Sequence, residues 1–327
     1  MKKILSIVVL LMVVTCVFAG CELLENEFDY DVTVSLYVDG ELYDTVPVKG
    51  NGRIEMPKAP EKENMIFVGW YVGDIFVREY DFSQPFLMDT SLTAHYVLDA
   101  VKITNLMTTE TMKSVVTIEY LAYNGVYDPE EGDHATVQGS GVVIDISGGW
   151  GYVLTNAHVA AELDGFENHE MHVVDAWGNS FEAKVYSNPK KSQPAISSDY
   201  DLALLCFEYE IPEFDIMQEI PVSDGDPYVG EYVISLGTPM GQYNSITYGQ
   251  VTSYKKVTVQ NQGSFTRTDF DVIEHNAEIL SGSSGGPLVD TNGKLVGLNF
   301  AAVNDGSIGC AIPLSQIHEF LSEYVYN

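Results

Sequence analysis

The stretch that decides the interpretation of this chain is Gly282-Ser283-Ser284-Gly285-Gly286-Pro287. Small residues let the main chain turn tightly enough to point neighbouring backbone N–H groups at a single spot. The oxyanion that forms when a carbonyl is attacked needs such donors, and the N–H groups of Gly282 and Ser284, on either side of Ser283, would supply them. A glycine-serine run alone is also typical of a flexible turn, so the interpretation depends on two further segments.

Those two segments place an imidazole and a carboxylate at strand ends. An apolar strand over residues 151–155 leads directly to His158, and Asp201 opens the apolar strand 202–205. A serine hydroxyl is a weak nucleophile that needs an adjacent base, and that base needs an acid to orient it. The chain order His158, Asp201, Ser284 is the chymotrypsin-type order, which differs from the subtilisin and α/β-hydrolase orders. The three motifs together predict a Ser-His-Asp triad.

Residues of about 105–325 resemble the HtrA (Deg) family of trypsin-like serine proteases. The matching segments are Gly139–Asp145, Tyr152–His158, Asp201–Leu205, Val229–Gly241, Gly249–Ser253, Gly282–Pro287, Leu295–Asn299 and Ile308–Pro313. The resemblance implies an all-β, chymotrypsin-like double β-barrel with the site between the barrels. It makes His158 the general base, Asp201 its orienting acid and Ser284 the nucleophile, with Gly282, Ser283 and Ser284 forming the oxyanion hole.

The chain departs from the family pattern in three places. Ser283 stands where Asn is usual, Cys310 stands where a bulky aromatic residue is common, and no PDZ domain is expected before the last residue, Asn327. Trimers are common in the family, so a homo-oligomer is a possible state, but no aromatic trimer segment can be identified. Regulation that depends on PDZ domains is not expected here.

The resemblance also implies a set of residues that bind substrate. The S1 pocket, which takes the P1 side chain before the cut bond, would be lined by Glu278, Ile279, Leu280, Leu298, Asn299, Phe300 and Cys310. Apolar Ile279 and Leu280 with a small Cys310 favour aliphatic P1 residues. An inward-pointing Glu278 would instead favour Lys or Arg, and we prefer the aliphatic alternative. An extended substrate is expected to pair with strand 298–301.

The N-terminus has the features of a secretory lipoprotein signal. Lys2 and Lys3 precede the apolar run 4–18, and Ala19-Gly20-Cys21 follows at the expected cleavage site. A basic start, a short apolar segment and small residues before the cut predict a leader over residues 1–20. The sequence at the cut resembles a bacterial lipobox, which implies lipidation of Cys21 and an acidic tether over 21–30. The alternative is an ordinary signal peptide with an unmodified cysteine.

Residues 31–97 form a separate predicted module. Alternating apolar residues over 32–38 followed by Asp39-Gly40 predict a strand and a hairpin turn. The segment resembles the Listeria–Bacteroides (internalin B-type) repeat, a small β-grasp-like module of bacterial surface proteins. We expect Trp70, Tyr71 and Phe82 to pack in its core rather than to bind a ligand. A spacer role is favoured, with adhesion as the alternative, and the protease domain is expected over 98–327.

Composition limits the functions that the chain can have. Its 327 residues carry a formal net charge of −31, which disfavours nucleic acid and anionic lipid head groups as partners. Four cysteines do not indicate a disulfide scaffold, and we expect Cys206 and Cys310 to be free thiols. No cofactor or metal is implied, since His169 and His172 are expected in a solvated loop. His275 is expected to pack or hydrogen-bond locally.

These observations together predict a serine endopeptidase, lipid-anchored on the extracytoplasmic face of a bacterial membrane and acting on polypeptides. Misfolded secreted proteins at the cell surface are a plausible substrate class. The main alternative is a non-catalytic binding or chaperone protein that uses a protease fold. A third interpretation makes the N-terminal module the main function, with the protease processing its partner.

Overall fold

The computed structural model describes residues 30–326 apart from 74, 75, 77, 131, 192, 212, 215, 239–244, 262, 263, 280 and 304–306. It divides into two compact units, of which the first extends to Asp99 and the second runs from Ala100. The predicted leader, Cys21 and nearly all of the tether lie outside the described residues. Within the described part of the chain, no helix combines the length and the apolar character that a membrane span requires.

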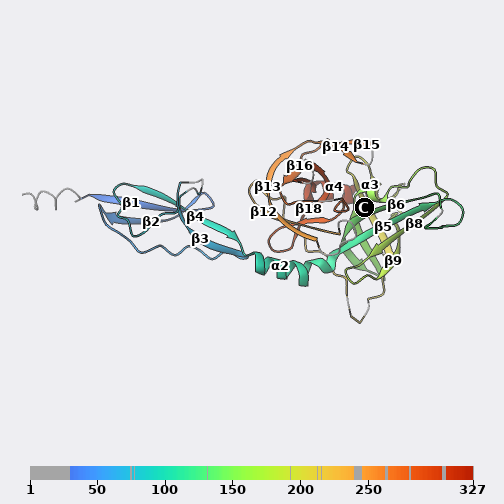
Figure 1. Ribbon diagram of the computed structural model, residues 1–327, viewed down its shortest axis with the longest axis horizontal. Helices are drawn as coiled ribbons and strands as arrows, with labels where there is room; N and C mark the ends of the chain where they lie inside the picture. The colour runs from blue at the N-terminus through green and yellow to red at the C-terminus, as the bar shows by residue number, and fades with distance from the viewer. Residues whose placement is uncertain are drawn as a thin grey trace, which may run out of the picture. The chain divides into compact units, whose positions relative to one another are not determined.

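The N-terminal unit is a four-stranded mixed sheet (Figure 1). Its strands are β1 (Asp31–Val38), β2 (Glu41–Lys49), β3 (Met65–Val72) and β4 (Thr90–Leu98), in the spatial order β2-β1-β4-β3 with β1 and β4 parallel. Trp70 is fully buried, and its indole N–H donates to the carbonyl of Pro57 at 2.8 Å. This bond ties the loop between β2 and β3 to the core, in which Phe82 is partly buried.

The first half of the C-terminal unit forms a closed barrel. Its six strands lie in the order β11-β7-β6-β5-β8-β9, and a β11–β9 pairing closes the ring. The strands are β5 (Val115–Tyr123), β6 (His134–Ser147), β7 (Trp150–Thr155), β8 (Asn168–Val174), β9 (Ser180–Val185) and β11 (Leu202–Glu208), with the short β10 (Ile196–Ser197) beside β11. Gly148 and Gly149 both have positive φ, as the tight β6–β7 hairpin requires.

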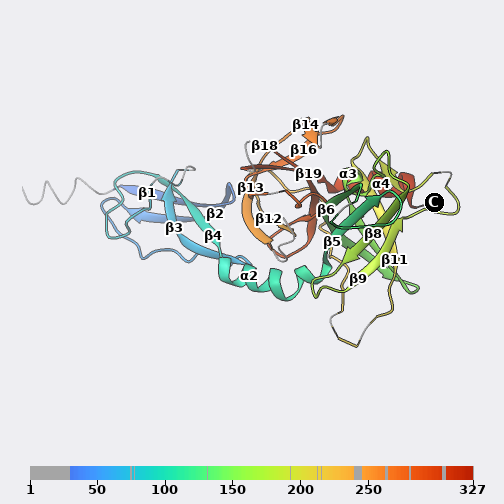
Figure 2. The same cartoon turned by 45° about the vertical axis from the view of Figure 1, so that its right-hand side comes forward.

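The second half forms another closed barrel of six strands, in the order β12-β13-β16-β19-β18-β17. These are β12 (Tyr232–Gly237), β13 (Ser245–Lys255), β16 (Val272–His275), β17 (Pro287–Val289), β18 (Leu295–Val303) and β19 (Ile308–Pro313). The hairpin of β14 (Thr258–Asn261) and β15 (Ser264–Arg267) extends from it. In Figures 1 and 2 the first barrel is coloured green to yellow and the second orange to red. The predicted double barrel is confirmed.

Few helices accompany the barrels. Helix α2 (Ala100–Thr109) and a 3-10 helix (Thr111–Ser114) lead into the first barrel, and α4 (Leu314–Tyr324) follows the second. Apolar side chains attach both longer helices to the unit, since α2 buries Ile103 and Met107 and α4 buries Phe320. The short α3 (Ala157–Ala160) follows β7 directly and carries His158. Strand ends and short connections therefore position the candidate site.

The core of the second barrel contains a histidine. His275 in β16 is fully buried, and its Nε2 lies 3.1 Å from Oδ1 of Asn299 in β18. The expectation that His275 packs or hydrogen-bonds locally is confirmed for its packing, whereas the bond to Asn299 joins two strands and residues 24 apart in the chain. Burial removes the water that would stabilise an imidazolium, and it lowers the pKa of His275 from 6.5 to about 4.

We expect this histidine to make the protein less stable in acid. Above pH 6.5 His275 is neutral in both the native and the unfolded state, and the native state has its full stability. As the pH falls towards 4, the unfolded state binds a proton at this residue that the native state does not bind, so stability is lost. Relative to a His275→Gln variant, the wild type should lose about 3 kcal/mol of unfolding free energy between pH 7 and pH 4, measured by urea titration.

The exposed His318 provides the control. A His318→Gln variant, which removes an exposed histidine instead of the buried one, is compared with wild type over the same pH range. A pH-independent difference between wild type and His275→Gln would contradict the buried-histidine account.

Candidate active site

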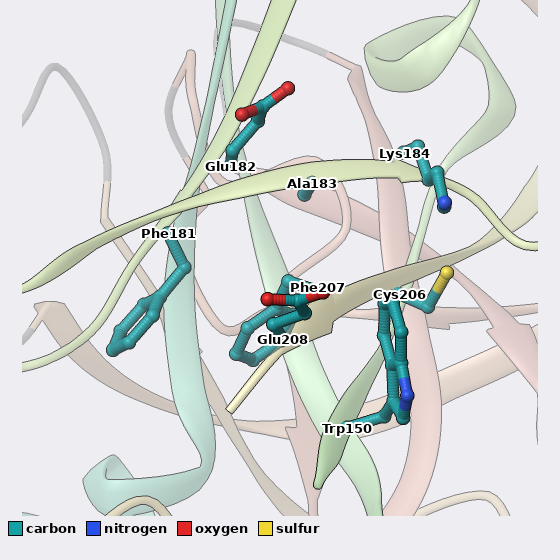
Figure 3. Close-up of a pocket in the computed structure, with 8 residues that line it drawn as sticks. All are labelled: Trp150, Phe181, Glu182, Ala183, Lys184, Cys206, Phe207 and Glu208. Carbon is teal, nitrogen blue, oxygen red and sulfur yellow. The ribbon is translucent and has the colours of Figure 1, made fainter. Parts of the chain in front are cut away.

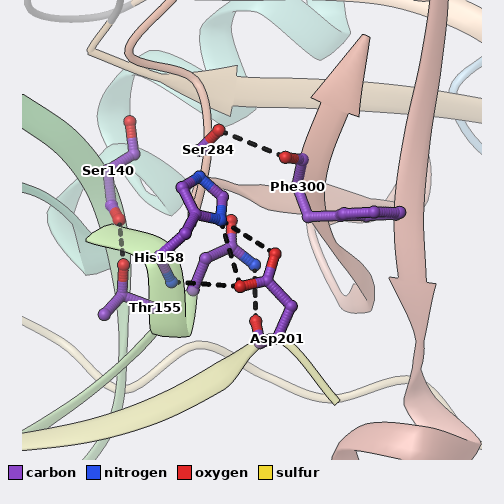
Figure 4. A network of polar contacts seen from close by, with 7 residues as sticks. Ser140, Thr155, His158, Asp201, Ser284 and Phe300 are labelled. Carbon is purple, nitrogen blue, oxygen red and sulfur yellow. Dashed lines mark hydrogen bonds and ion pairs between the residues drawn. The ribbon is translucent and has the colours of Figure 1, made fainter. Parts of the chain in front are cut away.

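His158 and Asp201 form the charged part of the site (Figure 4). Nδ1 of His158 lies 2.8 Å from Oδ2 and 3.0 Å from Oδ1 of Asp201, and the main-chain N–H of His158 donates to Oδ1 at 3.0 Å. A carboxylate can only accept, so Nδ1 carries the proton of the neutral ring. Nε2 is therefore left as the acceptor, which is the tautomer that a general base needs.

Asp201 is held in place by its backbone as well as by its side chain. It is 5% exposed and has a φ of 53°, in the left-handed region that non-glycine residues rarely adopt. The side-chain amide of Asn156, the residue before α3, donates to the carbonyl of Asp201 at 3.0 Å. Asn156 itself is fully buried. This bond fixes the turn that directs the carboxylate at His158.

Ser284 lies in the loop between β16 and β17, on the side of the His158 ring opposite Asp201 (Figure 4). Its hydroxyl donates to the carbonyl of Phe300 in β18 at 3.3 Å. His158 and Ser284 are each partly exposed, whereas Asp201 is buried. The structure thus brings the three predicted triad residues together, although they come from three separate segments of the chain.

Ser140 in β6 joins the first barrel to the loop that carries Ser284. Its N–H donates to the carbonyl of Ser284 at 2.7 Å, and its hydroxyl donates to the carbonyl of Gly282 at 2.7 Å. The same hydroxyl accepts from the N–H of Thr238 at 3.0 Å, and the carbonyl of Ser140 accepts from Thr155 Oγ1 at 2.7 Å. The N–H and hydroxyl of Ser140 therefore connect the first barrel to the second, whereas its carbonyl is bonded within the first barrel.

The close approach of Ser140 explains one glycine of the loop. Gly285 has a φ of +84°, and a Cβ atom there would lie 2.1 Å from the carbonyl oxygen of Ser140 and 2.3 Å from Thr155 Oγ1. Both the left-handed backbone conformation and the lack of space for a Cβ atom exclude any residue other than glycine at this position. Gly282, whose N–H is a predicted oxyanion donor, also has a positive φ, and the intervening Ser283 is buried.

Sequence reasoning assigned no role to four of these residues: Ser140, Thr155, Asn156 and Thr238. Ser140 lies in segment 139–145, and Thr155 and Asn156 lie in segment 152–158. Both segments match the HtrA pattern, so the resemblance could have indicated these residues. Thr238 precedes a proline in a similar segment. Their hydrogen bonds join residues far apart in the chain, so the sequence alone could not pair them.

The residues predicted for the S1 pocket differ in their exposure. Glu278 is exposed, and its carbonyl accepts from Thr247 Oγ1 at 2.7 Å, whereas Ile279 is 4% exposed. Leu280 lies outside the described residues. On β18, Leu298, Asn299 and Phe300 are buried. The side chain of Asn299 is directed at His275 inside the barrel, and its backbone N–H and carbonyl are bonded to Gly286 and Gly285.

Both cysteines of the described residues are free thiols. Cys310 in β19 is fully buried and lies opposite Glu274, and burial raises its pKa to about 11. Cys206 is buried beside a pocket of about 380 Å³ on the first barrel, and burial raises its pKa as well (Figure 3). Burial thus disfavours the reactive thiolate form of both cysteines.

The two histidines considered as metal ligands, His169 and His172, each contact a different polar side chain. His169 and His172 lie on β8, where Nδ1 of His169 contacts Tyr120 Oη at 2.6 Å and Nδ1 of His172 contacts Ser180 Oγ at 3.2 Å. The expectation of a loop was wrong, because both are strand residues, although His169 is exposed as expected. Across the described ranges, no three His, Cys, Asp or Glu side chains gather closely enough to hold a metal ion.

Comparison with known proteins agrees with this geometry. Residues 139–298 match the trypsin-like peptidase domain family. The chain is 34% identical over 194 residues to the periplasmic serine endoprotease DegP of Salmonella typhimurium, an alignment that covers 57% of this chain and 35% of DegP. It is 32% identical over 196 residues to serine protease HTRA1B of Danio rerio, covering 58% and 35%. The chain thus spans about a third of the length of these curated relatives.

A solved structure shows the same fold. The active form of the Rv3671c protease from M. tuberculosis superposes with a TM-score of 0.52 at 24% identity, covering 70% of this chain and 88% of that one. Residues 139–298 are therefore similar to trypsin-like peptidase domains and to HtrA-type serine proteases, and the C-terminal unit has a chymotrypsin-like double barrel.

The contribution of the hydrogen bond between Asn156 and Asp201 can be tested by measuring the stability of a variant that lacks it. An Asn156→Ala variant should lose about 1–2 kcal/mol of unfolding free energy, because the carbonyl of Asp201 loses its donor in a buried site. Urea titration would measure the loss. The control is Asn105→Ala on the exposed face of α2, where we expect a change within about 0.5 kcal/mol. Equal effects of the two substitutions would argue against a special role for Asn156.

Proposed function

We propose that this trypsin-like peptidase domain is an active serine endopeptidase in which Ser284 is the nucleophile, His158 the general base and Asp201 the acid that orients it. The observation that carries the proposal is the placement of the His158 ring between a buried carboxylate and a partly exposed serine. The Nδ1–H tautomer fixed by Asp201 leaves Nε2 on the side of Ser284. A protein that used the fold only for binding would have no need of this tautomer.

Catalysis would begin with rotation of the Ser284 hydroxyl. In the substrate-free site it donates to the carbonyl of Phe300, and attack requires that its proton be directed to Nε2 of His158 instead. As Oγ attacks the scissile carbonyl, His158 takes the proton, and the carboxylate of Asp201 stabilises the resulting imidazolium. The N–H groups of Gly282 and Ser284, with Ser283 between them, would bind the oxyanion.

The second half of the cycle returns the proton. The imidazolium of His158 protonates the leaving amine, which departs and leaves an acyl group on Ser284 Oγ. A water molecule, deprotonated by His158, then attacks the acyl carbonyl and releases the new carboxyl end. The protein contributes its own side chains and backbone N–H groups to these steps, and water is the second reactant.

Unfolded or misfolded extracytoplasmic polypeptides are the substrate class that we propose. The periplasmic DegP of Salmonella typhimurium is a relative over the protease domain, which supports an extracytoplasmic location. The predicted leader and lipidation of Cys21 would attach the enzyme to the membrane, and the net charge of −31 would keep its surface away from anionic head groups. A dedicated regulatory substrate is the narrower alternative.

Labelling with a fluorophosphonate tests the catalytic assignment. The purified full chain should gain one adduct by intact mass, Ser284→Ala should gain none, and Asp201→Asn should react about 10⁴-fold more slowly because the ring then adopts the wrong tautomer. No adduct on the folded wild-type protein would favour the binding or chaperone interpretation. Digestion and mass spectrometry would locate the adduct.

Cleavage of peptides that differ only at P1 tests specificity. We expect Leu to be preferred over Lys, since Ile279 is buried whereas Glu278 is exposed. A Glu278→Gln variant should change the Leu/Lys ratio of kcat/KM by less than about fivefold, because an exposed charge is screened by water and salt. Glu182→Gln, an exposed position on β9, is the matched control for charge. A selective and larger loss of Lys cleavage in Glu278→Gln would place that carboxylate in the pocket.

A further inference from the structure

Three polar side chains lie inside the second barrel, where apolar packing is the rule. Ser235 in β12, His275 in β16 and Asn299 in β18 are 4%, 0% and 0% exposed, next to an apolar cluster that includes Val251 and Ile273. Burying polar groups costs free energy unless each finds a partner. These three side chains form one chain of hydrogen bonds across three strands, which calls for a functional explanation.

The direction of each bond follows from the chemistry of the groups. The amide nitrogen of Asn299 donates to Ser235 Oγ at 3.0 Å and lies 3.4 Å from the carbonyl of Pro287. Oδ1 of Asn299 therefore faces His275, whose Nε2 lies at 3.1 Å and must be the donor. The N–H of His275 therefore favours the same orientation of the Asn299 amide as Ser235 and Pro287 do.

Asn299 also forms hydrogen bonds with the segment that follows Ser284. Its backbone N–H donates to the carbonyl of Gly286 at 2.9 Å, and its carbonyl accepts from the N–H of Gly285 at 2.8 Å. With the contact to Pro287, Asn299 bonds to three consecutive residues after the nucleophile. The β18–β19 pairing shifts between Asn299 and Ala301, which leaves the intervening carbonyl of Phe300 out of the ladder and available to the hydroxyl of Ser284.

We propose that His275 is a positioning residue for Ser284. Through Asn299 it fixes residues 285–287 and the carbonyl of Phe300, and so holds the serine hydroxyl in reach of both His158 and the substrate. His275 is buried and touches neither substrate nor the reacting atoms. This inference rests on the proposed function, because it assigns to His275 a role in the reaction of Ser284.

The fit of the imidazole against β19 supports a dedicated place for it. His275 pairs with Gly309, and a Cβ atom at that glycine would lie 2.1 Å from Cε1 of the ring. The barrel therefore leaves room for this ring by having no side chain opposite it. A Gly309→Ala substitution would displace the ring without changing its chemistry, which gives a second and independent way to disturb the contact.

The test measures the reaction of Ser284 in folded protein. In the full chain, His275→Leu removes the donor to Asn299, and we expect the fluorophosphonate rate constant and kcat for a peptide to fall about tenfold, with KM changed less than about twofold. His275→Gln keeps an N–H donor and should recover most of the rate. Gly309→Ala should lower the rate in the same way. Near-UV circular dichroism and an unfolding curve would establish that each variant is folded.

Ile273→Val, in the same strand and equally buried, is the matched control. It should lower stability with an unchanged rate per folded molecule. The positioning role is overturned if folded His275→Leu, or folded Gly309→Ala should His275→Leu not fold, reacts at the wild-type rate. It is overturned equally if His275→Gln is as slow as His275→Leu. A wild-type protein that does not react at all refutes the proposed function itself, which distinguishes the two failures.

Discussion

The candidate site depends on the hydrogen bonds of Ser140. This residue belongs to the first barrel, yet its N–H and hydroxyl bond to the carbonyls of Ser284 and Gly282, which follow strand β16. His158 and Asp201 also belong to the first barrel, whereas Ser284 belongs to the second. A small change in how the barrels meet would separate His158 from Ser284, so the bonds across this boundary set the distance on which the proposed chemistry depends.

The orientation of His158 has a separate origin within the first barrel. The carboxylate of Asp201 contacts both the ring and the main chain of His158, so the ring and the helix α3 that carries it are fixed together. Burying a carboxylate is costly, and the left-handed backbone at Asp201 adds strain. The donor groups of Asn156 and His158 offset that cost, and strain of this kind is typical of functional sites.

The sequence was sufficient for the parts of the structure that depend on local pattern. The apolar strands ending at His158 and beginning at Asp201, and the glycine-rich loop around Ser284, each have a short signature, and together with the family resemblance they predicted the double barrel and the site.

The partners of Ser140 and His275 were not predictable in this way, because each lies on a strand distant in sequence and is brought near only by barrel closure. The same holds for the shift between Asn299 and Ala301, which depends on strand register. His169 and His172 were misplaced because a short polar segment can also be an exposed strand.

Two buried polar networks hold the nucleophile loop, and the composition of the loop explains why they are polar. Residues 282–286 consist of glycine and serine and have no large side chain that could be packed. Only backbone N–H and carbonyl groups remain to be held, and these need hydrogen-bonding partners. Ser140 supplies them from the first barrel, and Asn299, oriented by His275, supplies them from inside the second. The polar residues of the barrel core therefore match the glycines of the loop, and the proposed oxyanion donors would account for those glycines.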